Sequence, residues 1–258
     1  MTITVKNLQF SYKNKPVLRD VNFSAHTGTC ICLLGENGAG KTTLFKCLLG
    51  LFHDYSGDIL IDDTNSKKLS TRQLARKIAY IPQAHAPMFN YSVFETVLMG
   101  TNVLTGGFRT PGSKEHKVAH EALERLNITH LAQRGYVEIS DGERQLTLIA
   151  RALAQKSRIL VMDEPTASLD YGNQFLLMQE IKRLTKEGYL ILLSTHNPEH
   201  ALRYADMTLV LKDGAAIAYG AAEEVLTPEM MKRIYGISVL QQSIRTSQGH
   251  IPVFLPYI

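Results

Sequence analysis

The sequence predicts an α/β fold, in which a parallel-sheet core carries an antiparallel β region at its amino end and an inserted helical subdomain. Residues 30–34, 159–162 and 190–193 are apolar without alternation, and helix-like sequence follows each run. This pattern is typical of parallel strands that are buried on both faces. Functional loops are therefore expected at the carboxyl ends of these strands.

The first expected element is an antiparallel hairpin. Apolar and polar residues alternate over residues 5–12 and 17–23, and residues 13–16 separate the two stretches. Alternation of this kind indicates strands with one covered face. In the apolar run that follows, Cys30 and Cys32 stand two residues apart, which suits a strand but not a disulfide between them. We expect buried, reduced thiols.

Helices dominate the middle of the chain. Residues 115–126 and 145–154 have helical patterns, and a loop that contains Gly and Pro occupies residues 105–112. We interpret this part as a subdomain inserted into the α/β core. The resulting division gives residues 1–86 and 156–236 to the core, residues 87–155 to the helical subdomain and residues 237–258 to a carboxyl-terminal tail.

Composition excludes several classes of protein. Apolar residues make up 45% of the 258 residues and charged residues 20%, which is close to the globular average and excludes disorder as the main state. No run approaches the roughly 18 apolar residues that cross a bilayer, and the amino end lacks the apolar centre of a signal peptide. The formal net charge of +4 is thinly spread, so we expect a cytosolic chain that does not bind nucleic acid.

A phosphate loop directly follows the first buried strand. Gly35-Glu36-Asn37-Gly38-Ala39-Gly40-Lys41-Thr42 matches G-x-x-x-x-G-K-[ST] between a strand and a helix. In such a loop, backbone N–H groups converge on an anion, the lysine reaches the β- and γ-phosphates, and the threonine hydroxyl ligates Mg²⁺. An ordinary glycine-rich turn is the competing interpretation. The candidate binding residues are Gly35, Asn37, Gly38, Gly40, Lys41, Thr42 and Thr43.

Polar groups also end the second and third buried strands. Asp163 is expected to hold Mg²⁺ through its water shell, and Glu164 to accept the proton of an attacking water. A solvated strand end with capping carboxylates is the alternative. His196, which ends the third strand, could hydrogen-bond the γ-phosphate.

A zinc site is the competing interpretation of His196. Residues 196–200 match H-x-x-E-H, but Pro198 suits a first helical turn and leaves His196 outside the helix. Zinc would need both His196 and His200 on one helical face, so we reject it.

Together these motifs resemble the ATP-binding-cassette (ABC) ATPases. Three further segments occur in the order found in that family: Tyr80-Ile81-Pro82-Gln83, Ile139-Ser140-Asp141-Gly142-Glu143-Arg144-Gln145 and Ala167-Ser168-Leu169-Asp170. The resemblance covers nearly the whole chain. It implies a P-loop NTPase core, ATP and Mg²⁺ as cofactors, and hydrolysis of ATP.

The resemblance also implies residue roles. Residues 140–143, hereafter the signature segment, would close over ATP that is bound by a second copy of the chain, with Ser140, Gly142 and Glu143 at the nucleotide. Gln83 would contact the metal and link the nucleotide to a transmembrane partner. Tyr12 would stack on adenine, and Asp170 would lie in a loop that crosses the dimer interface.

The residues leave two of these roles open. Tyr12 could equally be an aromatic residue packed on the opening hairpin. The pattern Ser140-x-x-Glu143 is also a capping box that opens an amphipathic helix. Capping and γ-phosphate binding use the same free N–H groups, so the two need not exclude each other.

One position departs from the usual signature, Leu-Ser-Gly-Gly-Gln. Asp141 stands at its third position, while Ile139 and Glu143 are milder changes. A carboxylate near an arriving γ-phosphate is unfavourable. Its side chain must therefore turn away or form a local cap.

Several segments resemble importers of iron–siderophore complexes, heme and cobalamin. These are Val97-Leu98-Met99-Gly100, Asp170-Tyr171-Gly172-Asn173-Gln174, Leu211-Lys212-Asp213-Gly214, residues 224–229 and residues 234–237. The resemblance implies integral-membrane permease subunits as partners, a substrate-binding protein as an indirect partner, and a peripheral place on the cytoplasmic face of the inner membrane. A permease would dock around Gln83 and residues 91–100. A soluble ATPase of iron–sulfur cluster assembly is the alternative.

Overall fold

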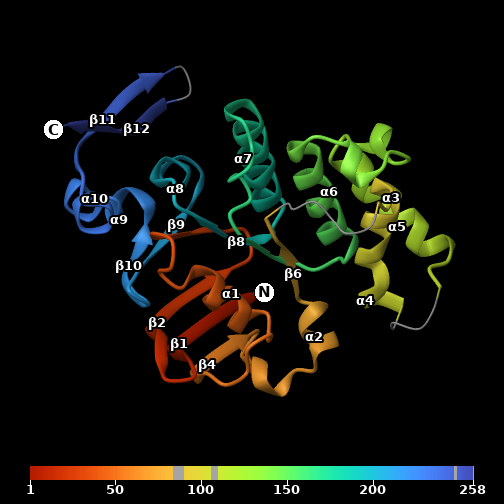
Figure 1. Cartoon of the computed structure of the whole chain (residues 1–258), viewed down its shortest axis with the longest axis horizontal. Coiled ribbons are helices and arrows are strands. Elements are labelled where there is room, and N and C mark those ends of the chain that lie inside the picture. Colours follow the sequence, from red (N-terminus) through yellow and green to blue (C-terminus); the bar gives the residue numbers. More distant parts are fainter. Residues whose placement is uncertain (84–89, 106–109, 247–248, 258) are drawn as a thin grey trace.

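A ten-stranded sheet runs through the molecule in the order β5-β4-β1-β2-β10-β9-β3-β8-β7-β6 (Figure 1). The computed structural model describes residues 1–83, 90–105, 110–246 and 249–257. The strands are β1 (Thr2–Tyr12), β2 (Lys15–His26), β3 (Cys30–Leu34), β4 (Ser56–Ile61), β5 (Thr64–Asn65), β6 (Ile78–Ile81), β7 (Ile159–Met162), β8 (Leu190–Thr195), β9 (Met207–Lys212) and β10 (Ala215–Ala221). The predicted α/β fold, with a parallel core and an antiparallel region, is confirmed.

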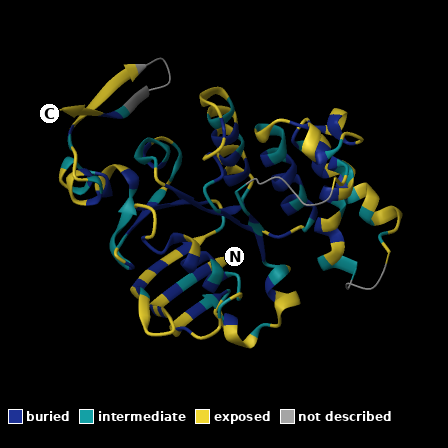
Figure 2. Ribbon diagram, viewed as in Figure 1, coloured by how far each residue is buried: buried dark blue, intermediate teal, exposed yellow. Residues whose placement is uncertain are grey.

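The antiparallel region is built from β1, β2, β4 and β5. The expected hairpin pairs β1 with β2 as far as Tyr12 and Lys15, so its turn is shorter than the sequence indicated. Buried residues such as Val5 and Phe23 alternate with exposed polar ones, as the two colours along these strands show (Figure 2). The sequence did not predict how this region joins the core. Strand β10 connects the antiparallel region to the parallel core, because it pairs with β9 and, at one position, with β2.

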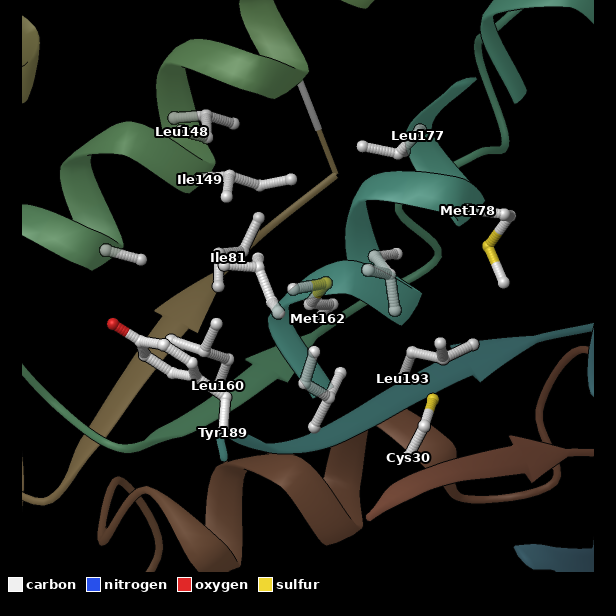
Figure 3. Packing of buried hydrophobic residues seen from close by; sticks show 14 of the residues in the cluster. Cys30, Ile81, Leu148, Ile149, Leu160, Met162, Leu177, Met178, Tyr189 and Leu193 are labelled. Carbon is white, nitrogen blue, oxygen red and sulfur yellow. The ribbon is translucent and has the colours of Figure 1, made fainter. Parts of the chain in front are cut away.

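The parallel core consists of β9, β3, β8, β7 and β6. Alternate residues of each central strand enter two separate apolar clusters, so Cys32 and Leu34 pack on one face of β3 while Ile31 and Leu33 pack on the other. Figure 3 shows the cluster on the first face. The expectation of strands buried on both faces is therefore confirmed.

The three cysteines are free and buried. Burial raises the pKa of the Cys30 and Cys47 thiols to about 12, so both are protonated at neutral pH. This outcome matches the expectation of buried, reduced thiols.

Helices cover both faces of the core. Helix α1 packs with the antiparallel region on one face, while α6, α7 and α8 contribute to the cluster on the other. The helices are α1 (Lys41–Leu48), α2 (Thr71–Ala75), α3 (Val93–Leu98), α4 (Asn102–Thr105), α5 (Ser113–Arg125), α6 (Asp141–Ala154), α7 (Tyr171–Lys186), α8 (Pro198–Tyr204), α9 (Ala222–Val225) and α10 (Pro228–Tyr235), with single 3-10 turns at η1 (Ser66–Lys68), η2 (Met99–Thr101), η3 (Thr129–Leu131) and η4 (Tyr136–Glu138).

Helices α3, α5 and α6 contact one another and lie together, and α6 also contacts β6 (Figure 1). They fall within residues 87–155, whose separation as a subdomain remains a prediction. The boundary between residues 86 and 87, and residues 106–109 of the expected loop, lie outside the described residues. In the described part of the chain, no helix is both long and apolar enough to cross a membrane.

A second, two-stranded sheet stands at the carboxyl end. Strands β11 (Ser238–Thr246) and β12 (Gly249–Tyr257) form an antiparallel hairpin, where the sequence had indicated only a tail. Val239 and Phe254 are buried, and the hairpin contacts α10 and α8. It therefore packs beside the helix that follows the end of β8.

Candidate active site

The phosphate loop connects β3 to α1, as expected. Its glycines are required by the backbone: Gly38 and Gly40 have φ of 85° and 105°, in the left-handed region that favours glycine. At Gly35 a Cβ would collide with the carbonyl oxygen of Leu211 on β9. The loop therefore keeps a conformation that larger residues would disturb.

Lys41 closes this loop on itself. Its ammonium group is buried and donates hydrogen bonds to the carbonyl oxygens of Gly35, at 2.7 Å, and Glu36, at 3.1 Å. A cavity of about 300 Å³ opens beside it. That cavity is lined by Val17, Asn37, Gly38, Gly40, Lys41, Thr42, Thr43 and Glu164. The loop's glycines and the first turn of α1 thus border one groove, which suits an anion.

Asp163 is held through both of its carboxylate oxygens. Oδ2 accepts hydrogen bonds from the Thr42 hydroxyl at 2.8 Å and from the Tyr80 hydroxyl at 3.4 Å, and Oδ1 accepts one from the Ser194 hydroxyl at 2.6 Å. Burial, together with the Asp163 charge, raises the pKa of Tyr80 to about 12, so this phenol stays protonated and remains a donor. The carboxylate is consequently fixed beside the hydroxyl of the phosphate loop.

Glu164, the residue after Asp163, has an unusual backbone conformation. Its φ of 44° places it in the left-handed region, which costs a residue with a Cβ roughly 1–2 kcal/mol. Its carboxylate lies between an ammonium group and an imidazole. Oε1 is 3.5 Å from Lys41 Nζ, and Oε2 is 3.3 Å from His196 Nδ1. The carboxylate is aimed at the groove, since Glu164 also lines the cavity.

His196 lies in the segment between β8 and α8. Its side chain is exposed, and its carbonyl oxygen accepts a hydrogen bond from the Tyr235 hydroxyl at 2.9 Å. Asn197 caps α8 and Pro198 is in its first turn, so His196 lies outside the helix, as the rejection of zinc required. His200 is inside α8, where its ring nitrogen is 3.5 Å from the Thr166 hydroxyl.

The signature segment begins α6. Ser140 is the N-cap, and its hydroxyl accepts a hydrogen bond from the Glu143 N–H at 3.3 Å, while Glu143 accepts from the Ser140 N–H at 2.8 Å. The hydrogen bond from the Ser140 N–H lowers the pKa of Glu143. The capping box is therefore present in the structure. Binding of a γ-phosphate by this segment stays a prediction.

Asp141 turns along its own helix. Its Oδ1 is 2.8 Å from Nη1 of Arg144, whose other nitrogens donate to the carbonyl oxygens of Tyr136 and Val137. The carboxylate is thus paired with a cation of its own helix, while its orientation toward an arriving γ-phosphate stays a prediction. Gly142 has little free space, because a Cβ there would lie 3.0 Å from the side chain of Asn173.

The remaining predicted residues are placed separately. Tyr12 is 44% exposed at the end of β1, and its ring packs edge-on against Phe10 and Phe52, so the packing interpretation describes part of its environment. Gln83 follows β6 at the same sheet edge as the end of β7. Asp170 caps α7, where hydrogen bonds from Asn173 lower the pKa of its carboxyl.

Sequence reasoning missed the roles of Ser194 and Tyr235. Ser194 lies near the end of β8 and bonds to the carboxylate of Asp163, while Tyr235 comes from α10. A hydroxyl at the end of an otherwise apolar strand was a usable signal for Ser194. Nothing local marked this role of Tyr235, because its contact with His196 spans 39 positions.

Comparisons with known proteins agree on one family. A profile described as ABC transporter matches residues 18–167. The hemin import ATP-binding protein HmuV of Bordetella parapertussis is 36% identical, covering 92% of this chain and 93% of that protein. The molybdate import ATP-binding protein MolC of Haemophilus influenzae is 32% identical, covering 98% and 96%.

A solved structure extends the similarity to the fold. It is described as an inward-facing conformation of a proposed metal-chelate type ABC transporter, and one of its chains is 31% identical with a TM-score of 0.89. The match covers 100% of this chain and 97% of that chain. The carboxyl-terminal hairpin therefore lies within the matched region.

Proposed function

Because this chain belongs to the ABC transporter family, we propose that it is the ATP-hydrolysing subunit of an importer for a metal chelate, of the iron–siderophore, heme or cobalamin type. The relatives named for hemin and molybdate import support a metal-containing cargo. The cargo would be held by the permease and not by this chain. The proposed identity of the cargo is therefore taken from the names of these relatives. Their names do not favour the alternative, a soluble ATPase of iron–sulfur cluster assembly.

The convergence of four side chains at one edge of the sheet carries the proposal: three line the groove, and Asp163 contacts one of them, Thr42. Lys41 and Thr42 come from α1, whereas Asp163 and Glu164 come from the end of β7, more than 120 positions along the chain. They meet because β3 and β7 are both neighbours of β8 in a parallel sheet, which aligns their carboxyl ends. A cation, a hydroxyl and two carboxylates beside or next to this cavity suit phosphoryl transfer from ATP to water.

The donor set also fits a magnesium ion. The hydroxyl of Thr42 and the carboxylate of Asp163 are hard oxygen ligands, they lie 2.8 Å apart, and Thr42 lines the groove. When bound, Mg²⁺ would neutralise charge on the β- and γ-phosphates. Thr42 would hold the ion directly and Asp163 through its water shell. Gln83 is the further candidate ligand from the same sheet edge.

Glu164 and His196 supply the chemistry of the attacking water. Glu164 would accept the proton of that water, because it lines the groove, whereas the carboxylate of Asp163 accepts a hydrogen bond from the Thr42 hydroxyl. His196, 3.3 Å from Glu164, would orient this carboxylate and contact the γ-phosphate. Lys41 would exchange its contacts with carbonyl oxygens for phosphate oxygens.

A second copy of the chain would complete the site. Strand β3, which precedes the phosphate loop, is separated from β6 by β8 and β7, a distance of roughly 14 Å at the usual strand spacing. Helix α6, which carries the signature segment, packs on the far side of that distance, against β6. The signature segment of one copy would therefore cover ATP in the other copy.

A permease helix would dock in a groove of about 400 Å³. The groove lies between the α1–α2 region and the α3–α6 helices, and both Leu51 and Met99 expose apolar surface there. Met99 and Gly100 belong to the stretch of residues 91–100 that the sequence indicated for docking. Tyr80 also lines this groove, so one residue contacts both Asp163 and the proposed docking surface.

Co-expression with candidate permease subunits tests the proposal. We expect the chain to co-purify with a polytopic membrane protein and to release phosphate from ATP in a Mg²⁺-dependent reaction. Leu51→Asp should weaken co-purification without changing ATP binding, because it places a charge in the docking groove. A stable complex with soluble scaffold proteins would favour the assembly-factor alternative, and turnover that requires DNA or RNA would overturn the proposal.

A further inference from the structure

Ser194 is a wholly buried hydroxyl between the two carboxylate residues of the candidate site. It lies at the next-to-last position of β8, and its exposed fraction is 0%. The hydroxyl donates to Asp163 Oδ1 at 2.6 Å and accepts from the backbone N–H of Glu164 at 2.9 Å. One hydroxyl therefore acts as the donor to Asp163 and as the acceptor from Glu164, two consecutive residues.

The contact with Asp163 decides which carboxylate oxygen faces Thr42. Ser194 occupies Oδ1, so Oδ2 is the oxygen that reaches the Thr42 hydroxyl. A carboxylate held at only one oxygen can rotate, whereas one held at both has a fixed plane. The orientation of Asp163 toward the metal position thus depends on a residue that does not line the groove.

The contact with Glu164 acts on the backbone. Glu164 has the left-handed φ of 44°, a conformation that persists where the surroundings impose it. Its N–H points to the Ser194 hydroxyl, and its carbonyl oxygen accepts from the Ala167 N–H at 3.1 Å. Without the hydroxyl, this N–H would lose its partner, and the peptide could relax away from the geometry that aims the carboxylate at Lys41.

We propose that Ser194 is a positioning residue that orients Asp163 for the metal and fixes the backbone of Glu164 for proton abstraction. This inference rests on the proposed ATPase function. It assigns one hydroxyl a simultaneous effect on two carboxylates, so removing it should weaken metal binding and lower turnover together.

Ser194→Ala is the test, and Ser157→Ala is its matched control. Ser157 is also a serine with an exposed fraction of 0%, and its hydroxyl donates to the carbonyl oxygen of Ala75 at 3.0 Å. Three quantities are compared: ATP affinity in EDTA, Mn²⁺ affinity of the ATP-bound protein by electron paramagnetic resonance, and kcat at saturating ATP. Thermal unfolding of both variants reports the loss of a buried hydrogen bond.

In Ser194→Ala we expect kcat and Mn²⁺ affinity each to fall about 10- to 100-fold, the usual effect of removing a group that orients a metal ligand. ATP affinity in EDTA should stay unchanged, because Lys41 and the phosphate loop are intact. Ser157→Ala should keep all three quantities. Equal kcat and Mn²⁺ affinity in the two variants would overturn the inference.

One result separates this inference from the proposed function, and a second covers a variant that fails to fold. If the wild-type chain binds ATP and Mn²⁺ but does not hydrolyse ATP, the proposed function fails. The Mn²⁺ titration still tests whether Ser194 orients Asp163. If Ser194→Ala does not fold, amide hydrogen exchange of the wild-type chain decides. The Glu164 amide should then exchange as slowly as the amides of β7 and β8, and exchange at the rate of an exposed loop would refute its bond to Ser194.

Discussion

The ammonium nitrogen of Lys41 lies 3.5 Å from carboxylate oxygen Oε1 of Glu164. This pair joins the residue expected to bind phosphate to the residue expected to activate water. Lys41 is buried and Glu164 is 22% exposed, so each charge partly offsets the desolvation of the other. Binding of ATP would bring a competing anion to Lys41. Phosphate would therefore draw Lys41 away from this pair and leave Glu164 to His196 and water.

Lys41→Ala should weaken nucleotide binding. Loss of hydrogen bonds from a charged group costs about 1.5–3 kcal/mol, which corresponds to roughly a 10- to 100-fold rise in Kd for ATP. A titration with fluorescent ATP measures this change. Lys77→Ala is a matched control, because Lys77 is ion-paired to Asp62 away from the groove. Unchanged affinity in Lys41→Ala would count against the phosphate loop as the binding site.

Glu164→Gln should separate binding from hydrolysis. The amide cannot accept the proton of water, so kcat should fall about 10²- to 10⁴-fold, the usual contribution of a general base. ATP affinity should persist or rise, since Lys41 loses a competing anion. Phosphate release and ATP titration measure the two quantities. Glu180→Gln, which removes a carboxylate paired to Arg183 on α7, should change neither. Near-normal turnover would remove Glu164 from the role of base.

Asp141→Gly tests the departure in the signature segment. The carboxylate faces Arg144 and is half exposed, so its loss should lower the free energy of unfolding by only about 1 kcal/mol. ATPase activity should stay within a few-fold, because Arg144 holds the carboxylate along its own helix. Denaturation and phosphate release measure these effects. If the variant instead dimerises more tightly with ATP in sedimentation, the carboxylate reaches the γ-phosphate during closure.

Tyr235→Phe tests the link between α10 and His196. The variant removes one neutral hydrogen bond, worth about 0.5–1.5 kcal/mol, so kcat should fall roughly two- to tenfold while KM for ATP stays unchanged. Tyr219→Phe is the matched control, because its hydroxyl also donates to a backbone carbonyl oxygen, that of Ser24, far along the sheet from β8. The same loss of kcat in both variants would show that the Tyr235 contact is not specific to His196.

The sequence was most informative where function depends on short segments. The phosphate loop and the pair Asp163-Glu164 each follow a strand whose apolar run is unbroken, and β3 and β7 have the predicted bounds. A parallel sheet then aligns the ends of such strands, so their meeting at one edge could be expected. The proposed residues of the site were found from these local patterns.

Contacts between distant segments could not be read in this way. The bond from Ser194 to Asp163 depends on the register of β8 against β7, which the sequence does not specify. The hairpin of β11 and β12 was missed for another reason: Gln241, Gln242 and Ser243 interrupt the alternation of β11. The hairpin is stabilised by its packing on α8 and α10, which the local sequence pattern does not reveal.

A composite site explains why two chains would be needed. Each chain has one phosphate loop and one signature segment, which begin different helices on opposite sides of β8 and β7. Closure of a symmetric dimer would supply the Ser140 end of α6 to ATP on the partner and exclude water other than the attacking one. Hydrolysis would then release the closed dimer.

A mixed dimer tests this arrangement. In a Lys41→Ala chain the phosphate loop is damaged, and in a Ser140→Arg chain the N-cap of α6 is replaced by a bulky cation. Either homodimer has two damaged sites and should be inactive. A mixed dimer keeps one site in which both halves are intact. Random mixing makes half of the dimers mixed, so about a quarter of the wild-type activity should return at most. A Ser140→Arg homodimer with full activity, or a specific ATPase rate that stays constant as protein is diluted through the dimerisation range, would show that one chain suffices.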